Sequence, residues 1–157
     1  IDLADVVGLD VVLHVGEIIT RALGRDEPPM VAQLRDKVAA KQLGRKTGSG
    51  LYTWTDGKAV KPPGGTPPAD LQDRLLLPLV NECVACLREG IVADEDLVDA
   101  GVVFGTGFAP FRGGPLAYAR QRGVDAVSAR LAELAVRYGS RFDADPGFAT
   151  LREPRAQ

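Results

Sequence analysis

Cys83 and Cys86 have the C-x-x-C spacing that redox dithiols and zinc sites use. A redox pair usually lies at a helix N-terminus, where the helix dipole lowers the thiol pKa, but this pair lies inside a helical pattern. A structural zinc ion needs about four ligands, and the chain offers two cysteines and one histidine. We therefore predict two reduced, core-facing cysteines and no metal site.

His14 is the one histidine of the chain, and it lies in mid-helix between Leu13 and Val15. Histidine is the side chain most often used for general acid-base catalysis. A packed or partly exposed structural histidine fits this position better, because no Ser-His-Asp or Cys-His spacing accompanies it. We predict no catalytic residue in this chain.

Three polar residues are candidates for contact with a substrate or a partner: Asn81, Glu82 and Arg112. Asn81 and Glu82 interrupt an apolar helical pattern, so they make a helix-helix or interdomain hydrogen bond, or they face a substrate. Arg112 lies in a glycine-rich turn. It could bind a phosphate or an acid, or it could close its loop onto a nearby carboxylate or carbonyl.

The glycine segments do not match the fingerprints of nucleotide sites. In residues 44–50 the lysine precedes the central glycine, which is the wrong order for a phosphate loop. Residues 105–107 have Pro110 where a dinucleotide fingerprint needs its third glycine, and no strand pattern precedes them. We predict no cofactor-binding residue here.

Apolar residues recur at helical spacing along most of the chain. This periodicity predicts helices at residues 2–23 with a break at Gly8, and at 30–43, 70–89, 94–104, 115–122, 124–138 and 147–152. Pro78 lies within the strongest of these patterns, where we expect a kink. Residues 51–55 have the composition of a short extended piece, and Gly and Pro dominate residues 56–68.

Composition indicates a soluble globular protein: 157 residues, 45% hydrophobic and 25% charged, with a formal net charge of -2. Without a basic excess, nucleic acid is an unfavourable partner. We find no apolar run long enough to span a membrane, and no signal peptide, so we expect a cytoplasmic protein. The chain begins within an apolar pattern and without Met, which indicates a fragment or a processed product.

Two short similarities in the same order indicate an internal repeat. Residues 8–12 resemble residues 123–127, and residues 32–36 resemble residues 149–153 at nearly the same offset. The alternative is chance similarity between amphipathic helices. The repeat predicts three regions: the tail of one helical copy at 1–55, a linker at 56–68 and a second copy at 69–157.

Several motifs together resemble one family. Arg-Leu-Leu-Leu-Pro-Leu-Val-Asn-Glu at 74–82, residues 87–93, and residues 99–115 with Phe-Gly-Thr-Gly-Phe-Ala-Pro-Phe-Arg-Gly-Gly-Pro resemble 3-hydroxyacyl-CoA dehydrogenase C-terminal domains. Residues 5–10 and 44–52 resemble later signatures of the first copy in multifunctional fatty-acid oxidation enzymes. The resemblance implies an all-α helical bundle like the C-terminal domain of 6-phosphogluconate dehydrogenase, here as a partial tandem repeat.

The resemblance also implies a reaction, in which NAD takes a hydride from the 3-hydroxyl carbon of an acyl-CoA during fatty-acid β-oxidation. The NAD fold and the His-Glu pair of such enzymes belong to an upstream domain, and neither is matched here. The family has an active-site Asn just before its Arg-Leu-Leu-x-Pro run, where this chain has Asp73. We therefore expect an inactive fragment without NAD, whose helices close over the substrate site and support assembly.

The implied partners are the acyl-CoA and the Rossmann domain of the full-length enzyme, and a homo-oligomer or a complex with a thiolase subunit. Two other interpretations remain open at this point. One is a stand-alone helical module for binding or oligomerisation. The other is the helical domain of a related hydroxyacid dehydrogenase.

Overall fold

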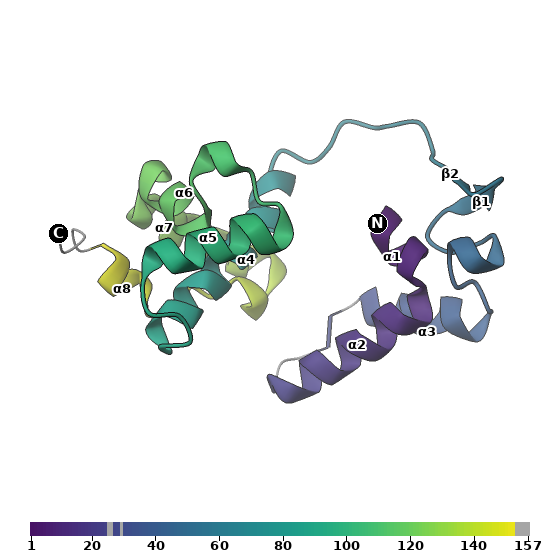
Figure 1. Ribbon diagram of the computed structural model, residues 1–157, viewed down its shortest axis with the longest axis horizontal. Helices are drawn as coiled ribbons and strands as arrows, with labels where there is room; N and C mark the ends of the chain where they lie inside the picture. The colour runs from purple at the N-terminus through teal and green to yellow at the C-terminus, as the bar shows by residue number, and fades with distance from the viewer. Residues whose placement is uncertain (25–26, 29, 153–157) are drawn as a thin grey trace. The chain divides into compact units, whose positions relative to one another are not determined.

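A computed structural model describes residues 1–24, 27–28 and 30–152. The chain divides into two units, unit 1 (Ile1–Gly65) and unit 2 (Thr66–Gln157), which we describe separately (Figure 1). Helices dominate both units, and the one sheet among the described residues has two strands of three residues. The all-α prediction is confirmed.

Unit 1 begins with two helices joined at a glycine, α1 (Asp2–Val7) and α2 (Leu9–Ala22). Gly8 has φ 112° and ψ 130°, a conformation that is unfavourable for residues with a Cβ, so it separates the helices as predicted. Helix α3 (Met30–Ala39) contacts α2 through an interface that buries Leu34. It ends four residues before the predicted boundary, since the backbone reverses at Lys41, which has a φ of 56°.

A hairpin follows the 3-10 turn η1 (Arg45–Thr47) in unit 1. Strand β1 (Thr53–Thr55) pairs antiparallel with β2 (Lys58–Val60). Asp56 and Gly57 form the two-residue connection, and both have positive φ, 51° and 74°, as a type I′ hairpin turn requires. This corrects the expected linker at its start: residues 58–60 are a strand, and the Asp-Gly turn signal explains why.

Unit 2 is a bundle of helices around one hydrophobic core. It contains α4 (Leu71–Arg88), α5 (Glu95–Thr106), η2 (Pro110–Arg112), α6 (Pro115–Arg122), α7 (Val124–Tyr138), η3 (Ser140–Phe142) and α8 (Phe148–Leu151). Fully buried Leu77, Leu116 and Leu131 come from α4, α6 and α7 and meet in the core. Asp94 caps the start of α5, where its Oδ1 accepts a hydrogen bond from Leu97 N at 2.8 Å.

The two units contain the same helix-glycine-helix geometry. Gly123 joins α6 to α7 with φ 95° and ψ 117°, close to the values of Gly8 between α1 and α2. In both places the glycine carbonyl accepts a hydrogen bond from the fourth residue on, Val12 N or Val127 N, at 3.0 Å. This similarity supports the repeat. Its second segment, residues 149–153, begins in α8, and Glu153 lies outside the described residues.

A helix that crosses a bilayer must be both long and predominantly apolar. None of the described helices meets both requirements.

Candidate functional site

Asp73, in the first turn of α4, is the centre of an ion-pair cluster in unit 2. Arg122 at the end of α6 donates to both of its carboxylate oxygens, at 2.5 and 3.2 Å. Arg130 of α7 donates to Oδ2 at 2.8 Å. These hydrogen bonds, that of Arg122 first, hold the pKa of Asp73 below its ordinary value despite partial burial. Asp73 therefore connects the start of α4 to two other helices as a carboxylate.

An open cavity of about 540 Å³ adjoins this cluster. Its lining residues carry polar or charged groups: Gln72, Asp73, Arg112, Tyr118, Gln121 and Arg122. The candidate Arg112 is one of them, and its guanidinium carbon lies 5.4 Å from the ring centroid of Phe111 and 5.9 Å from that of Tyr118. No carboxylate of the described residues forms an ion pair with Arg112. The geometry therefore does not favour the alternative that Arg112 closes its loop onto a nearby carboxylate.

Asn81, the second candidate, fixes a loop of its own unit. Its Nδ2 donates to the carbonyl oxygen of Asp143 at 2.9 Å, and its Oδ1 accepts from the amide of Asp145 at 2.8 Å. Arg88, two helical turns along α4, donates to Asp145 Oδ1 at 2.8 Å. With both ends of its amide engaged, Asn81 fits the structural alternative better than a substrate contact.

An ion pair between Arg88 and Asp145 also holds this loop against α4. Burial raises the pKa of Asp145, but the hydrogen bonds from Arg88 and from Gly147 N outweigh burial and leave the pKa below its ordinary value. The third candidate, Glu82, is half-buried beside this loop attachment on α4, and its charge contributes to the raised pKa of Cys83.

The Cys83 and Cys86 thiols are free and lie in the interior of α4. Burial raises the pKa of Cys83 to about 12, and the neighbouring Cys86 adds to the shift. A thiol with such a pKa stays protonated at neutral pH, and the thiolate is the reactive form. The core-facing interpretation of Cys83 agrees with this environment.

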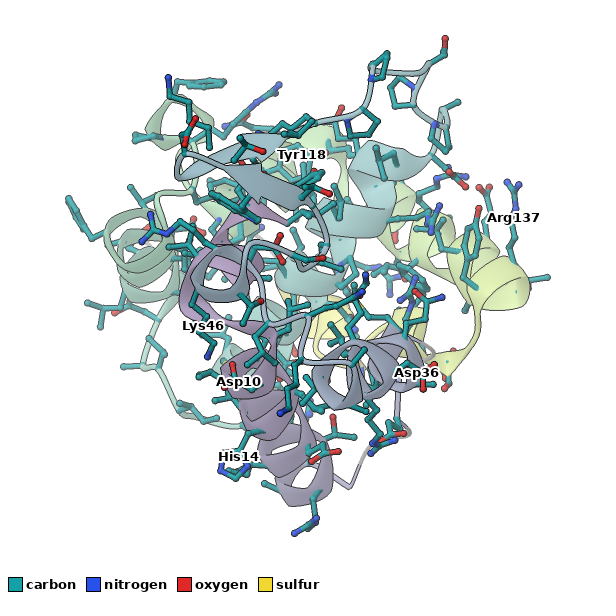
Figure 2. The ribbon with its side chains drawn as sticks, turned by 90° about the vertical axis from the view of Figure 1, so that its right-hand side faces the viewer. Asp10, His14, Asp36, Lys46, Tyr118 and Arg137 are labelled. Atoms are coloured by element: carbon teal, nitrogen blue, oxygen red, sulfur yellow. The ribbon has the colours of Figure 1, made fainter. Side chains whose placement is uncertain are left out.

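His14 is exposed on α2 of unit 1, where Figure 2 labels its side chain. Lys46 of η1 contacts α2 nearby and forms an ion pair with Asp10 at 2.6 Å. Across the described ranges, no group of three or more His, Cys, Asp or Glu side chains is placed to hold a metal ion.

Three aspartates of the described residues are buried, namely Asp5, Asp70 and Asp99, and none of them is a candidate site residue from the sequence. In unit 1, fully buried Asp5 accepts hydrogen bonds from Leu51 N at 2.8 Å, Tyr52 N at 2.9 Å and Trp54 Nε1 at 2.8 Å. In unit 2, Asp99 accepts from Leu116 N at 2.7 Å and so caps the start of α6. A usable signal was available for Asp99, since a Gly-Gly-Pro helix start exposes amides that need an acceptor.

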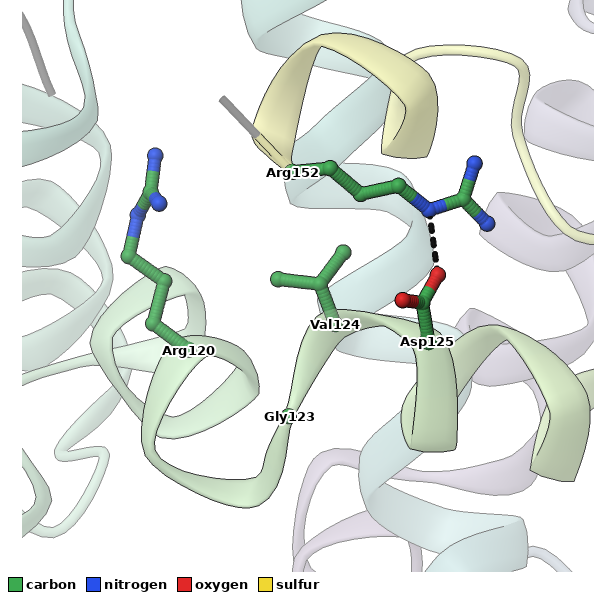
Figure 3. A pocket seen from close by; sticks show the side chains of 5 residues that line it. All are labelled: Arg120, Gly123, Val124, Asp125 and Arg152. Carbon is green, nitrogen blue, oxygen red and sulfur yellow. Dashed lines mark hydrogen bonds and ion pairs between the residues drawn. The ribbon is translucent and has the colours of Figure 1, made fainter. Parts of the chain in front are cut away.

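A second open cavity, of about 320 Å³, lies between α6, α7 and α8 of the same unit (Figure 3). Its two arginines are paired with acids. Arg152 donates to Asp125, as the dashed line in Figure 3 marks, and Arg120 donates to Glu95 at 2.8 Å. The positive charges of this cavity are already compensated within the unit.

Comparisons with known proteins place these features in a family. Residues 1–54 match the model of the 3-hydroxyacyl-CoA dehydrogenase C-terminal domain. The chain is 36% identical over 162 aligned residues, 96% of its length, to the fatty acid oxidation complex subunit alpha of Vibrio campbellii. Residues 1–54 are thus similar to the 3-hydroxyacyl-CoA dehydrogenase C-terminal domain, and nearly the whole chain is similar to a fatty acid oxidation alpha subunit. The resemblance inferred from its motifs is thereby confirmed.

Fatty acid oxidation complex alpha subunits of other bacteria are also similar to this chain. The one from Shewanella amazonensis is 34% identical over 89% of the chain, and the one from Idiomarina loihiensis is 34% identical over 78%. The chain spans only 23% of the length of the Vibrio campbellii subunit and 22% and 20% of the other two.

NAD, the cofactor of the family, does not fit the described part of this chain. A dinucleotide site needs parallel strands with a glycine-rich turn into a helix. The described residues contain one antiparallel pair of three-residue strands and no such turn. No chemical step can therefore be assigned to NAD at these residues.

Proposed function

We propose that this chain is the helical C-terminal part of an NAD-dependent 3-hydroxyacyl-CoA dehydrogenase of fatty-acid β-oxidation, within a multifunctional cytoplasmic enzyme. The similarity to fatty acid oxidation alpha subunits over 96% of the chain is the observation that carries the proposal. In this proposal NAD and the acyl-CoA bind mainly to other parts of the enzyme, and these helices support closure of the substrate site and assembly.

The environment of Asp73 supports a non-catalytic role for this copy. The family has its active-site Asn at this position, where it can donate and accept hydrogen bonds. Asp73 has no donor while it is ionised, and both of its oxygens bind Arg122 or Arg130. The residue therefore stabilises the bundle in the place where a working copy would present an amide to the substrate.

An assay of the isolated chain tests where catalysis resides. With acetoacetyl-CoA and NADH, we expect no oxidation of NADH by the 157-residue chain, nor by its Asp73→Asn variant. Circular dichroism should establish that both proteins are folded. Clear turnover by either protein would contradict the proposal that the catalytic groups lie elsewhere.

A chimera tests the role within the enzyme. The segment of the Vibrio campbellii alpha subunit that aligns with this chain would be replaced by this chain. We expect the chimera to retain NADH-dependent reduction of acetoacetyl-CoA. A folded chimera that lacks this activity, although the parent subunit has it, would favour the rival interpretation of a stand-alone helical module.

A further inference from the structure

Arg112 has an unusual position for an arginine at the surface of this bundle. It ends the short η2 turn, and its guanidinium lies near the rings of Phe111 and Tyr118. Cation–π contacts with the two rings position the guanidinium but do not use its N–H groups, which stay available for a ligand. Among the described residues, no hydrogen bond or ion pair of this guanidinium is found. Arg112 is therefore held in place without being neutralised.

The carboxylate that lines the same cavity already has hydrogen-bond partners. Asp73 is the one acid that lines the cavity, and its oxygens accept from Arg122 and Arg130. Arg130 also donates to Glu133, which lies outside the cavity lining, at 2.6 Å. The cluster thus holds three guanidinium groups against two carboxylates, so one positive charge remains uncompensated beside the cavity.

The neutral groups of the lining add hydrogen-bond donors. The Tyr118 hydroxyl accepts from Arg122 Nη1 at 3.0 Å, which leaves its own hydrogen for another acceptor. Gln72 and Gln121 contribute carboxamide groups. The Gln121 amide makes one long bond of 3.4 Å, to the carbonyl oxygen of Arg112. A ligand that only accepts hydrogen bonds is the best complement to this set.

The cavity of Figure 3 lacks this property. Its arginines, Arg120 and Arg152, have carboxylate partners, so an anion entering it would compete with Glu95 and Asp125. The Arg112 cavity is therefore the better candidate for anion binding in unit 2.

We propose that the cavity beside Arg112 binds a phosphoryl dianion, with Arg112 as the charged contact and Tyr118, Gln72 and Gln121 as further donors. A phosphate group carries a charge of about -1.5 to -2 at neutral pH and three oxygens that accept hydrogen bonds. The volume of about 540 Å³ also admits an organic substituent on the phosphate. This inference does not depend on the proposed dehydrogenase function.

Titrations followed by NMR test this site in the 157-residue chain. The ligands are inorganic phosphate, adenosine 3′,5′-bisphosphate and, as the phosphate-free comparison, adenosine. The Nε–H signal of Arg112 and the side-chain amide signals of Gln72 and Gln121 report on the cavity. We expect saturable shifts of these signals with both phosphates, in the millimolar range, and none with adenosine. Binding should strengthen as the pH rises through about 6, where the second phosphate proton is lost.

Two variants assign the binding to Arg112. Arg112→Gln should weaken phosphate binding by about tenfold, because a hydrogen bond between charged groups is lost. Arg141→Gln is the matched control: Arg141 also lies over a ring, that of Phe142 at 4.6 Å, but it does not line the cavity. The Arg141→Gln variant should bind phosphate with the same affinity as the unmodified chain. Both arginines are exposed, so both variants should fold.

The outcomes separate the possible ligands. Shared shifts with inorganic phosphate and the bisphosphate identify the phosphoryl group as the recognised part. Tighter binding of the bisphosphate at the same signals assigns an organic monoester. The proposal is wrong if no ligand gives saturable shifts, if adenosine shifts the signals alone, or if the Arg112→Gln and Arg141→Gln variants behave alike.

Discussion

At the scale of single residues, buried carboxylates organise both units. Asp5 is fully buried in unit 1 and forms no direct ion pair with another described residue. Its oxygens accept hydrogen bonds from two backbone amides and the Trp54 indole. In unit 2, Asp99 accepts hydrogen bonds from two backbone amides at the start of α6. A buried N–H group that loses its acceptor destabilises the fold by more free energy than the hydrogen bond contributes. Each aspartate is therefore difficult to replace.

Replacement of Asp5 by Asn should destabilise unit 1 by about 2–4 kcal/mol, because an amide NH₂ would face N–H donors in a buried site. Trp54 is the one tryptophan of the chain and binds Asp5 directly, so its fluorescence during urea unfolding measures the effect. Asp36→Asn, on the exposed face of α3, is the control and should change little. Equal urea midpoints for the two variants would refute this role of Asp5.

At the scale of elements, glycines fix the angles between helices. The repeated joints at Gly8 and Gly123 use positive φ values that an added Cβ would strain. Space is not the constraint at Gly123, where a Cβ would lie 3.7 Å from its nearest neighbour, the Ala126 Cβ. The backbone conformation alone therefore explains the glycine between α6 and α7.

Gly123→Ala should lower the free energy of unfolding by about 1–3 kcal/mol through backbone strain. Gly101→Ala should act in the opposite direction and stabilise α5 by about 0.5–1 kcal/mol, since Gly101 is helical and a Cβ there meets no atom within 4 Å. Thermal unfolding followed by circular dichroism measures both changes. A stabilised or unchanged Gly123→Ala variant would show that the joint tolerates a side chain.

At the scale of the whole molecule, acid should weaken the fold. Burial raises the pKa of Asp5, but its hydrogen bonds and the charge of Lys37 leave it below the ordinary value of 3.8, and the pKa of Asp73 is lowered as well. A carboxyl whose pKa is lower in the folded state stabilises the fold above its unfolded pKa. That contribution decreases as the pH falls below about 4 and is lost once the pH falls through the folded pKa.

The acid dependence can be assigned with the Asp5→Asn variant. Unfolding of unit 1, followed by Trp54 fluorescence, should depend less on pH below about 4 in this variant than in the unmodified chain. The Asp36→Asn variant should retain the full dependence. If all three proteins lose stability in parallel, Asp5 is not a source of the acid sensitivity.

Helices α2 and α7, which both follow a glycine with positive φ, differ in how far their apolar side chains are buried. In α7, Val127, Leu131 and Leu134 are buried in the core of unit 2. In α2, a row of large apolar side chains is 43–52% exposed: Val11, Val15, Ile18 and Ile19, continued by Leu23 after the helix. We expect an apolar row of this length to be a surface for association.

We expect the chain to self-associate through this row as its concentration rises, as sedimentation velocity would measure. Ile19→Glu should reduce the association, because it places a charge in the apolar row. Val136→Glu is the control, since Val136 is 92% exposed on α7 of unit 2 and lies outside the row. A chain that stays monomeric at all concentrations, or equal effects of both variants, would contradict the expectation.

The sequence determined the local structure and the family of this protein. Helices α6 and α7 have the predicted bounds, because apolar periodicity and flanking glycine and proline act within a few residues. The β2 strand was missed because three residues have too little periodicity to separate them from a Gly/Pro-rich segment. The ordered motifs were sufficient for the family, which needs no contact between distant residues.

Only the tertiary structure decided which polar groups meet. Asp73 binds Arg122 and Arg130 from 49 and 57 positions away, and Asn81 binds the backbone at Asp143 from 62 positions away. No local pattern encodes such pairs, because they depend on how helices pack and on where each side chain then points. The open guanidinium of Arg112 is likewise a result of packing, since the same turn could have placed it against a carboxylate.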